Sequence, residues 1–552
     1  MSKSDADQQV TMSLGWRRAL LLALVVAGLF AMYLSAELRQ NHEPGFPLDD
    51  SWIHMTFARN LARGWGLAYN HGEPVAGSTA PLWTFILALV HVLVRNALAA
   101  VVVAKLLGAA LLFVSAVFAF RITARLTGSK WTGLAAGLAV VTLGPMGWAM
   151  MSGMEVTLSV ALTLAGIYYY LRFRTGRLSV LAWVLLGLAA WARPESMLLA
   201  VFAALDSLLR RFVLKQRLAF WRGFGVWLVV VLAYFGLNYS LSGSPFPQTY
   251  QAKVGNTGLF AAVAAGNFPQ LKGLLIVSVP SYFAEFCVHL WRANPMLAML
   301  VPVGLFGLVV SALRRRRSTG LFIPLVVLGY VPAIGLVSPV GGAAFQSGRY
   351  IGNATALAAV VAVIGLAYVW RLIRQRVIRL GVTATLSALT VFNVLTVTSA
   401  TVRNTTRAES SINQMQVALG QWLADNTPAG ATIACNDIGA IGYFSNRRIL
   451  DLRGLVTKGR LGYRGDREGA IAFVNDRKPD FLVIFPVLYP GLKDAPFLKV
   501  VAYADVRDNT VILFDFRPHA RTIAGVLILD LVIRPVPVTM AVFKCNWDML
   551  PP

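Results

Sequence analysis

The sequence predicts an α-helical polytopic membrane protein with a C-terminal α/β domain outside the membrane. Hydrophobic residues occupy 57% of the 552 positions, whereas only 14% of the positions are charged. Long apolar runs recur from residue 17 to residue 400, which is more than a soluble protein of this size needs for its core. After Ala400 the composition becomes that of a small soluble domain. We therefore predict a membrane domain over residues 1–400 and an α/β domain over residues 401–552.

The first apolar run extends from Ala19 to Ala36 and is long enough to cross a membrane. It follows Arg17 and Arg18, and it ends in Leu34-Ser35-Ala36, a poor site for signal peptidase. We expect this run to be a retained membrane anchor whose N-terminus faces the cytoplasm.

The positions of the basic residues predict the topology. The net charge is +25, but the arginines and lysines are clustered in the loops between apolar runs, as expected for cytoplasmic loops and not for a nucleic-acid-binding surface. The clusters are Arg121–Lys130, Arg172–Arg177, Arg210–Arg217, Arg314–Arg317 and Arg371–Arg379. About eleven spans satisfy this rule, near residues 17–36, 97–120, 131–149, 156–171, 178–192, 196–209, 223–241, 296–313, 320–338, 351–370 and 380–400.

One apolar segment, Pro81 to Val94, is left out of this set. It is shorter than the ~20 residues that a straight span needs, and counting it would place most later basic clusters outside. We expect a juxtamembrane or re-entrant helix at the outer face, beside an amphipathic helix at Trp52 to Leu61. The orientation of every later span depends on this assignment.

Periodicity predicts the elements of the C-terminal domain. Ser411 to Asn426 is typical of an amphipathic helix, "ATIACND" of a strand, and "GAIAFVNDRKPDFLVIF" of a helix followed by a strand. "VVAYADVRDNTVILFDF" predicts two strands about a polar turn, and "TIAGVLILDLVI" a buried strand. The three cysteines match no metal-binding spacing, and a disulfide between Cys435 and Cys545 would be compatible with an extracytoplasmic domain.

The predicted topology gathers isolated polar residues on the outer face. The cytoplasmic side carries arginines in runs, whereas the outer side carries single acids and bases among Gly, Pro and aromatic residues. The outer residues are Asp49, Asp50, Glu155, Arg193, Glu195, Tyr250, Lys253, Arg349 and Tyr350.

For Asp50, Glu155, Arg193 and Glu195, a structural role is an alternative to a functional one. Asp50 could cap a helix from Ser51 to Gly64, but capping explains one acid and not two. Glu155 could favour the dipole of the helix that it precedes. Arg193 and Glu195 could form an ion pair within a Pro-broken hairpin, or contact substrate. Lys253 and Arg349 lie on the outer side, against the positive-inside rule. Their position there favours an anionic partner for them.

This set of residues suits glycosyl transfer from a polyprenyl phosphate. An acid at the outer boundary can take the proton of an acceptor hydroxyl, a second acid can orient a substrate, and Lys or Arg can neutralise a lipid-linked phosphate. A nucleotide sugar would instead require the acids on the cytoplasmic face. Two adjacent acids without a third ligand are weak evidence for a divalent cation, so metal dependence stays open.

Several motifs follow one another in a fixed order: "LDD" followed by "FARNLARGWGLAYNHGEPVAGSTAPLW", then "SGMEV", "ARPE", "GSPFPQTYQAK", a late "RY" and "WLADNTPAGATIACNDIGAIGYFSNRRILDLRGLV". This order resembles the bacterial GT-C glycosyltransferases, and among them it is most similar to the actinobacterial arabinofuranosyltransferases and their uncharacterised bacterial relatives. The resemblance implies an inverting transferase in the bacterial inner membrane that works in cell-envelope biogenesis. Its site would face the periplasm and use a decaprenyl- or undecaprenyl-phosphate sugar.

Carried over to this sequence, the resemblance makes Asp49 or Asp50 the general base and Glu155 the second-loop acid. It places Lys253 and Arg349 at the donor phosphate. The sequence departs from the pattern "DDAYI" and "EGFTNPLW" of such relatives, because it has "DDSWI" and "AGSTAPLW". Ala76 replaces an acid and Ala80 an amide, which leaves the sugar and the glycan acceptor open.

The C-terminal domain is expected to bind the acceptor glycan, with a purely structural cap as the alternative. Cys435-Asn436-Asp437 has no identifiable histidine partner, so we predict no nucleophilic site there. A transporter or flippase would place its ionisable groups near the bilayer midplane and usually shows two similar halves, neither of which is found. A scaffold would need neither the paired acids nor the outer cations.

Overall fold

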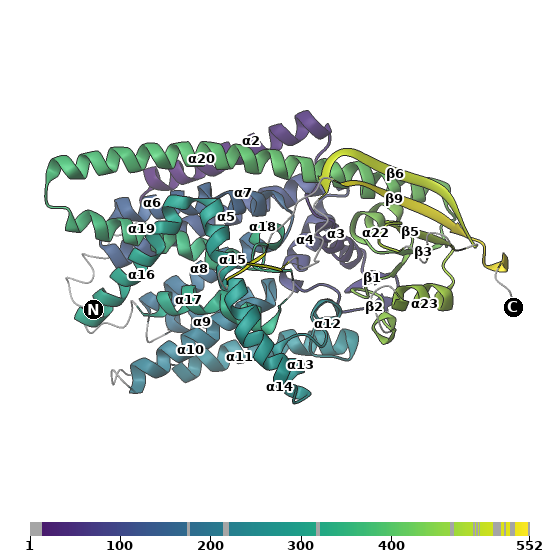
Figure 1. The fold of residues 1–552 in the computed structure, drawn as a ribbon, viewed down its shortest axis with the longest axis horizontal. Coiled ribbons are helices and arrows are strands. Elements are labelled where there is room, and N and C mark those ends of the chain that lie inside the picture. The colour runs from purple at the N-terminus through teal and green to yellow at the C-terminus, as the bar shows by residue number, and fades with distance from the viewer. Residues whose placement is uncertain are drawn as a thin grey trace.

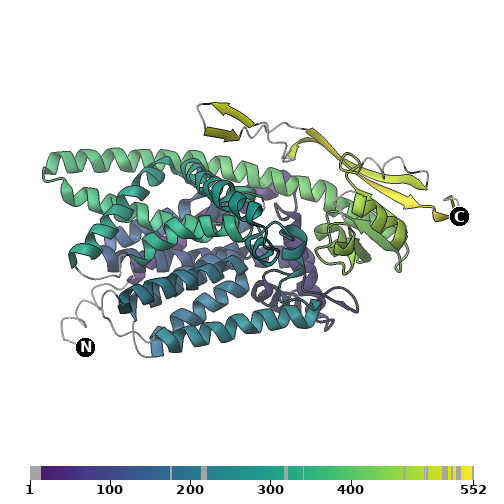
Figure 2. The same cartoon turned by 60° about the horizontal axis from the view of Figure 1, so that its bottom comes forward.

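The chain folds into a long helical bundle with an α/β unit at one end, as Figures 1 and 2 show. The computed structural model describes residues 14–549 apart from 174–176, 213–219, 316–320, 340, 464–467, 490–491, 493–494, 496, 512–519, 524–525 and 530–535. Most helices of the bundle run along its long axis. The long ones are α2 (Trp16–Asn41), α5 (Ala97–Thr127), α8 (Val156–Arg172), α9 (Arg177–Ala192), α10 (Met197–Phe212), α11 (Phe220–Ser242), α15 (Val279–Ala293), α16 (Pro295–Arg315), α17 (Phe322–Val337), α19 (Gly352–Leu372) and α20 (Arg376–Ile412).

The protein is a multi-pass membrane protein, but the predicted count of about eleven spans is not reproduced. Within the described ranges, six helices are long and apolar enough to cross a membrane: Trp16–Asn41, Ala97–Thr127, Trp221–Ser242, Phe268–Ala293, Pro295–Leu313 and Gly352–Leu372. A seventh would be the pair α6 (Lys130–Thr142) and α7 (Gly144–Met151), which is bent by 59° at its break. Several predicted spans, among them 156–171 and 178–192, form helices that are too short to qualify.

The helix over Phe268–Ala293 was not among the predicted spans; it consists of α14 (Phe268–Gly273), a short π-helix and α15. It contains Lys272 and Glu285, but its mean hydropathy of 1.5 is high enough for a membrane span. In Figure 1 α15 stands obliquely to the other helices of the bundle. The segment Pro81–Leu93 forms α4, a 13-residue apolar helix at the end of the bundle near the α/β unit.

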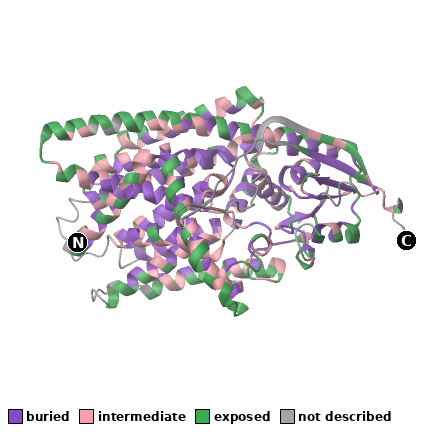
Figure 3. Cartoon of the chain, in the orientation of Figure 1, coloured by how far each residue is buried: buried purple, intermediate pink, exposed green. Residues whose placement is uncertain are grey.

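Burial is concentrated in the centre of the bundle, where α8 and α19 carry mostly buried residues and α5 packs against both (Figure 3). Helix α20 lies along α2 on the outside and is largely exposed over its first half. Near its end Glu409 accepts a hydrogen bond from the buried Lys105, at 3.0 Å, and Glu37 of α2 accepts another at 2.6 Å. This buried ion cluster ties three helices together, because each charge would be costly to bury alone.

Helix α20 leads directly into the C-terminal unit. It continues through a π-turn (Asn413–Val417) into α21 (Ala418–Asn426), so the predicted boundary at residue 400 falls within one continuous helix. The predicted helix over Ser411 to Asn426 is confirmed as the end of this long helix. The turn between α19 and α20, with its arginine cluster, lies at the opposite end of the bundle from the α/β unit.

The C-terminal unit is built on a five-stranded sheet of order β4-β3-β5-β9-β6. Strands β3 (Thr432–Cys435), β4 (Arg448–Asp451) and β5 (Phe481–Ile484) are parallel, and β9 (Val536–Cys545) runs antiparallel to β5 and to β6 (Leu498–Val511). Helices α22 (Gly439–Ser445) and α23 (Glu468–Arg477) follow β3 and precede β5 respectively. The predicted strand at "ATIACND" and the helix and strand at "GAIAFVNDRKPDFLVIF" are confirmed.

Three expectations for this unit are wrong. Within the described residues, the stretch from Val500 to Val511 forms one strand, β6, with register shifts against β9 and no turn; residues 512–516 of the predicted second strand lie outside the described residues. "TIAGVLILDLVI" forms parts of two short strands, β7 (Ala520–Ile523) and β8 (Val526–Leu529), which pair with each other. Cys435 and Cys545 are free. They lie on β3 and β9 with β5 between them, and strands two apart are separated by about 10 Å, too far for a disulfide.

Helix α3 (Asp49–Ala62) forms the junction between the two parts of the chain. It was expected to be amphipathic, yet its residues from Ser51 to Ala58 are all buried. Helix α4 packs on one side of α3, and α22 of the C-terminal unit packs on the other. The Trp52 ring packs against the rings of Tyr443 and Phe444, so the helix has no solvent-facing side along this stretch.

Candidate active site

Asp50 is held by two basic residues from distant parts of the chain. Its Oδ2 lies 2.8 Å from Nη2 of Arg349 and 3.5 Å from Nζ of Lys253. Arg349 follows the short helix α18 (Phe345–Gly348), and Lys253 ends α12 (Gln248–Lys253). Burial alone would raise the pKa of Asp50, but Lys253 and Arg349 outweigh it and lower the pKa below its ordinary value. The helix-cap interpretation of Asp50 is wrong, because the carboxylate lies inside the first turn of α3 and reaches these cations.

Asp49 has a different environment. Its two carboxylate oxygens accept hydrogen bonds from the backbone N–H groups of Gly439 and Ala440, at 2.7 and 2.8 Å. These are the first residues of α22, so Asp49 connects α3 to the C-terminal unit. Burial and the neighbouring carboxylate of Asp437 raise the pKa of Asp49 to about 8, against the lowering effect of the two N–H groups. The two adjacent acids therefore face different partners.

Glu155 is the centre of a second, almost fully buried ion cluster. Its Oε1 lies 2.5 Å from Nη1 of Arg193, and its Oε2 lies 3.3 Å from Nε2 of His54. Arg193 is also 3.4 Å from Glu195, across the Pro194 turn that separates α9 from α10. Burial would raise the pKa of Glu155, but Arg193 and His54 prevail and lower it. The expected pairing of Arg193 with Glu195 is present, and Arg193 binds Glu155 as well.

His54 was missed by the sequence analysis. It lies on α3 four residues after Asp50, and residues spaced by four lie on one face of a helix. Its Nδ1 is 3.4 Å from the hydroxyl oxygens of Thr84 and Ser78. The spacing from Asp50 was the signal that could have identified it.

The turn before Glu155 is fixed by side chains of α3 and α4. Ser51 donates a hydrogen bond to the carbonyl of Ser152 at 2.6 Å, and the indole of Trp83 donates to the carbonyl of Gly153 at 2.9 Å. Gly153 has a φ of +69°, and a Cβ atom there would overlap the ring of Phe46. The "SGMEV" motif thus provides a tight turn that presents Glu155 to the ion cluster.

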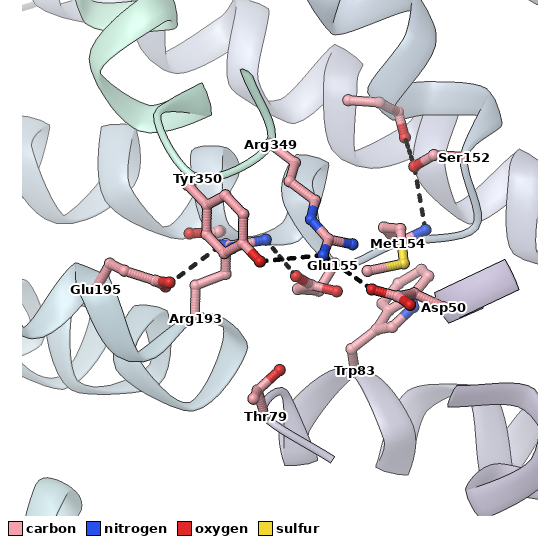
Figure 4. Close-up of polar contacts among 12 residues, drawn as sticks. Asp50, Thr79, Trp83, Ser152, Met154, Glu155, Arg193, Glu195, Arg349 and Tyr350 are labelled. Carbon is pink, nitrogen blue, oxygen red and sulfur yellow. Dashed lines mark hydrogen bonds and ion pairs between the residues drawn. The ribbon is translucent and has the colours of Figure 1, made fainter. Parts of the chain in front are cut away.

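Arg349 and Tyr350 follow a strained segment. Gln346, Ser347 and Gly348 all have positive φ values, a backbone conformation that costs energy at the two non-glycine residues. The Tyr350 ring lies between the guanidinium groups of Arg193 and Arg349, at 4.7 and 5.0 Å from its centroid, and its hydroxyl is 3.0 Å from Nη2 of Arg349 (Figure 4). This arrangement holds two buried arginines side by side.

Arg349 has two hydrogen-bond donors that no described residue accepts from. Nε and Nη1 of Arg349 are buried and have no hydrogen-bond partner among the described residues. Buried guanidinium donors are normally satisfied, so these two nitrogens mark a place for an acceptor group of a ligand. Across the cluster, the acids Asp50, Glu155 and Glu195 are balanced by Lys253, Arg193 and Arg349.

Tyr250, like Asp49, is a predicted site residue whose polar group is directed away from the ion clusters. Its hydroxyl donates to the carbonyl of Val337 at 3.0 Å, and its ring stacks on Phe246. Ala76 contributes only its backbone, which bonds the hydroxyl of Ser242 and the N–H of Gln248. Ala80 is fully buried before α4.

The residues do not fit a divalent cation. Within the described ranges, no group of three or more His, Cys, Asp or Glu side chains is placed to hold a metal ion. Asp50 and Glu155 already have arginine or lysine counter-charges, and a cation bound between them would be repelled by Arg193 and Arg349.

Comparison with solved structures identifies the fold. The chain is similar to the Archaeoglobus fulgidus oligosaccharyltransferase crystallised with Zn and sulfate, with a TM-score of 0.54, 12% identity, and coverage of 85% of this chain and 68% of that one. It is also similar to ArnT from Cupriavidus metallidurans bound to undecaprenyl phosphate, with a TM-score of 0.52, 13% identity, and coverage of 86% and 96%. The chain has the GT-C-like fold.

Other comparisons add little about function. Another structure of the archaeal oligosaccharyltransferase, tethered to an acceptor peptide with the NVT sequon, matches with a TM-score of 0.54 and 11% identity over 83% of this chain and 69% of that one. Residues 401–523 match the family described as "Domain of unknown function (DUF8728)". No curated protein matches the sequence.

Proposed function

We propose that the protein is a membrane glycosyltransferase that moves a sugar from a polyprenyl-phosphate donor to a cell-envelope glycan. The sugar is a pentofuranose such as arabinose, or a hexose. The observation that carries the proposal is the Asp50 carboxylate clamped by Lys253 and Arg349, with two buried donor nitrogens of Arg349 left without a partner. An acid beside unsatisfied cations suits a hydroxyl nucleophile and a phosphate leaving group.

In this proposal the reaction is a single displacement with inversion. The acceptor oxygen attacks the anomeric carbon while its proton passes to Asp50, and the bond from that carbon to the phosphate oxygen breaks. The polyprenyl phosphate leaves with the bonding electrons, and Arg349 and Lys253 neutralise its added charge. Glu155 holds Arg193 and His54 in place behind the reacting groups.

The environments of the two adjacent acids favour Asp50 as the base. Both oxygens of Asp49 are occupied by backbone N–H groups of α22, so this carboxylate has little capacity left for an acceptor hydroxyl. Asp50 is 28% exposed in its side chain and points at the cations. We therefore assign proton abstraction to Asp50 and a positioning role to Asp49.

The lowered pKa of Asp50 suggests an order of binding. With Arg349 and Lys253 at its side, Asp50 is a weak base. A donor phosphate competes for the same two cations, and their withdrawal raises the pKa of Asp50 toward the value that base catalysis needs. In this scheme the donor binds first and prepares the base for the acceptor.

The proposed orientation places the cluster and the C-terminal unit outside the bacterial inner membrane. The helices α3 and α12, which carry Asp50 and Lys253, lie toward the end of the bundle that bears the α/β unit, whereas the arginine-bearing turn between α19 and α20 lies at the other end. Basic loops are retained in the cytoplasm. A lipid-linked donor, already transferred across the bilayer, could reach this outer site, whereas cytoplasmic nucleotide sugars could not.

The direct test uses the purified full-length protein in nanodiscs with radiolabelled polyprenyl-phosphate pentoses and hexoses. Release of the sugar from the lipid, and its transfer to added envelope glycans, is expected, while the matching nucleotide sugars give none. Asp50→Asn protein serves as the inactive control. Use of nucleotide sugars would refute the proposal, as would movement of intact glycolipid across vesicles without bond cleavage, which would indicate the transporter or flippase alternative.

A further inference from the structure

The C-terminal sheet presents one edge to the Asp50 site. Strands β3, β4 and β5 are parallel, so the loops that follow them leave the sheet at the same, carboxyl edge. These loops carry Asn436 and Asp437 after β3, Arg453 after β4, and the segment leading to Tyr489 after β5. Ligands of parallel α/β sheets bind at this edge.

Two contacts hold this edge against the membrane domain. Asp49 binds the N–H groups of Gly439 and Ala440, just beyond Asp437. Gln248 donates hydrogen bonds from Nε2 to the carbonyls of Gly454 and Thr457, at 2.9 and 2.8 Å. The anchors are next to the proposed base and its cation, because Asp49 precedes Asp50 and Gln248 begins the short helix that Lys253 ends.

The side chains at this edge are polar and incompletely satisfied. Asp437 is half-buried and accepts hydrogen bonds from Gln416 and from Asn436, each at 2.9 Å. Oδ1 of Asn436 is buried and has no partner within the described part of the chain. Arg453 is exposed beside them and lowers the pKa of Asp437, which burial raises overall. A buried carbonyl without a donor is unfavourable unless a ligand supplies one.

We propose that this edge is the acceptor subsite, and that it binds the hydroxyl groups of a neutral glycan. Asp437 and Asn436 accept hydrogen bonds from sugar hydroxyls, and Arg453 donates one. The N–H groups at the start of α22 are already used by Asp49, so the edge offers acceptors rather than an anion site. The inference rests on the proposed glycosyl transfer and extends it, because it states which part of the chain selects the acceptor.

The test compares three variants of the full-length protein. Asp437→Asn removes the carboxylate but keeps its shape, and Arg453→Ala removes an exposed side chain, a change expected to affect folding little. Asp480→Asn is the matched control: Asp480 is exposed and precedes β5, so it lies at the opposite edge of the sheet, where it accepts the N–H of Thr432 at 2.8 Å.

Two measurements are made with defined probes, namely neutral octyl oligosaccharides of arabinose, mannose and glucose. The first is transfer from the polyprenyl-phosphate donor, recorded as separate KM values for donor and acceptor together with donor hydrolysis by water. The second is calorimetric binding of the oligosaccharides without donor. We expect Asp437→Asn to raise the acceptor KM at least tenfold and Arg453→Ala at least threefold, with donor KM and donor hydrolysis within twofold of wild type.

The outcomes separate the subsite from the function. Acceptor KM values within twofold of wild type for both variants would overturn the subsite, as would equal losses in donor and acceptor use, which indicate a structural role. If the wild-type protein cleaves no polyprenyl-phosphate sugar, the proposed glycosyl transfer is refuted. Calorimetry still tests the acceptor subsite in that case. The subsite is refuted if no oligosaccharide binds, or if Asp437→Asn leaves binding unchanged.

Discussion

Replacement of Asp50 by Asn is the most informative perturbation of the proposed site. The amide cannot accept the acceptor proton, and a general base typically contributes ~10²–10⁴-fold to turnover, or about 2.7–5.4 kcal/mol at 1.36 kcal/mol per tenfold change. The change also leaves Arg349, 4% exposed, without its closest carboxylate. Removing one partner of a buried pair costs about 3–5 kcal/mol, and the cost here is expected below about 3 because the Asp50 side chain is 28% exposed.

A second substitution separates catalysis from folding. Asp50→Glu keeps the charge beside Arg349 and Lys253 but moves the carboxylate by one methylene. We expect it to unfold within a few degrees of wild type and still to lose at least tenfold in turnover, because proton transfer depends on position. The assays are thermal unfolding in detergent and single-turnover release of sugar from the polyprenyl-phosphate donor.

A reversal of the effects expected for the Asp49 and Asp50 variants would refute the assignment of Asp50 as the base. If Asp50→Asn retained turnover within threefold of wild type at equal folded amount, while Asp49→Asn abolished it, the assignment of the two acids would be wrong. In the expected result Asp49→Asn keeps turnover within a few-fold and lowers the stability of the α3–α22 contact, since one backbone N–H loses its acceptor at a cost of about 1–3 kcal/mol.

Three further outcomes are expected. Arg349→Lys should raise the donor KM at least tenfold, measured with polyprenyl-phosphate sugar, because one ammonium cannot replace the planar donors; an unchanged KM would argue against a phosphate contact. Folding raises the pKa of Asp49 from 3.8 to about 8, so the protonated side chain stabilises the folded state. This stabilisation is complete below about pH 4 and lost by about pH 8, so the thermal unfolding midpoint of the wild-type protein should fall as the pH rises over this range. Asp49→Asn should flatten that fall, and an identical slope would contradict the assignment. After the native cysteines are removed, a cysteine at exposed Asn256 should react with an impermeant thiol reagent added outside, and one at exposed Gln375 should not; the reverse pattern would invert the topology.

The sequence alone determined the class of the protein and predicted most residues of the proposed site. Hydrophobic runs and basic loops are local properties of the chain, so a multi-pass helical protein with a C-terminal α/β unit followed from them directly. Asp50, Glu155, Arg193, Glu195, Lys253 and Arg349 were predicted because the topology places single acids and bases on the outer face, among Gly, Pro and aromatic residues.

Only the tertiary structure decided which partner each of these residues contacts. Asp49 and Asp50 are neighbours in sequence, but successive residues of a helix point in directions about 100° apart, so one reaches α22 and the other reaches Arg349. No local pattern shows that α22 would pack on α3. The same holds for His54, whose link to Glu155 requires α3 and α8 to meet, and for Asp437, which the sheet brings to this junction from nearly 390 residues away. Spacing along one helix is encoded locally, whereas pairing between distant elements depends on packing that the whole chain must satisfy at once.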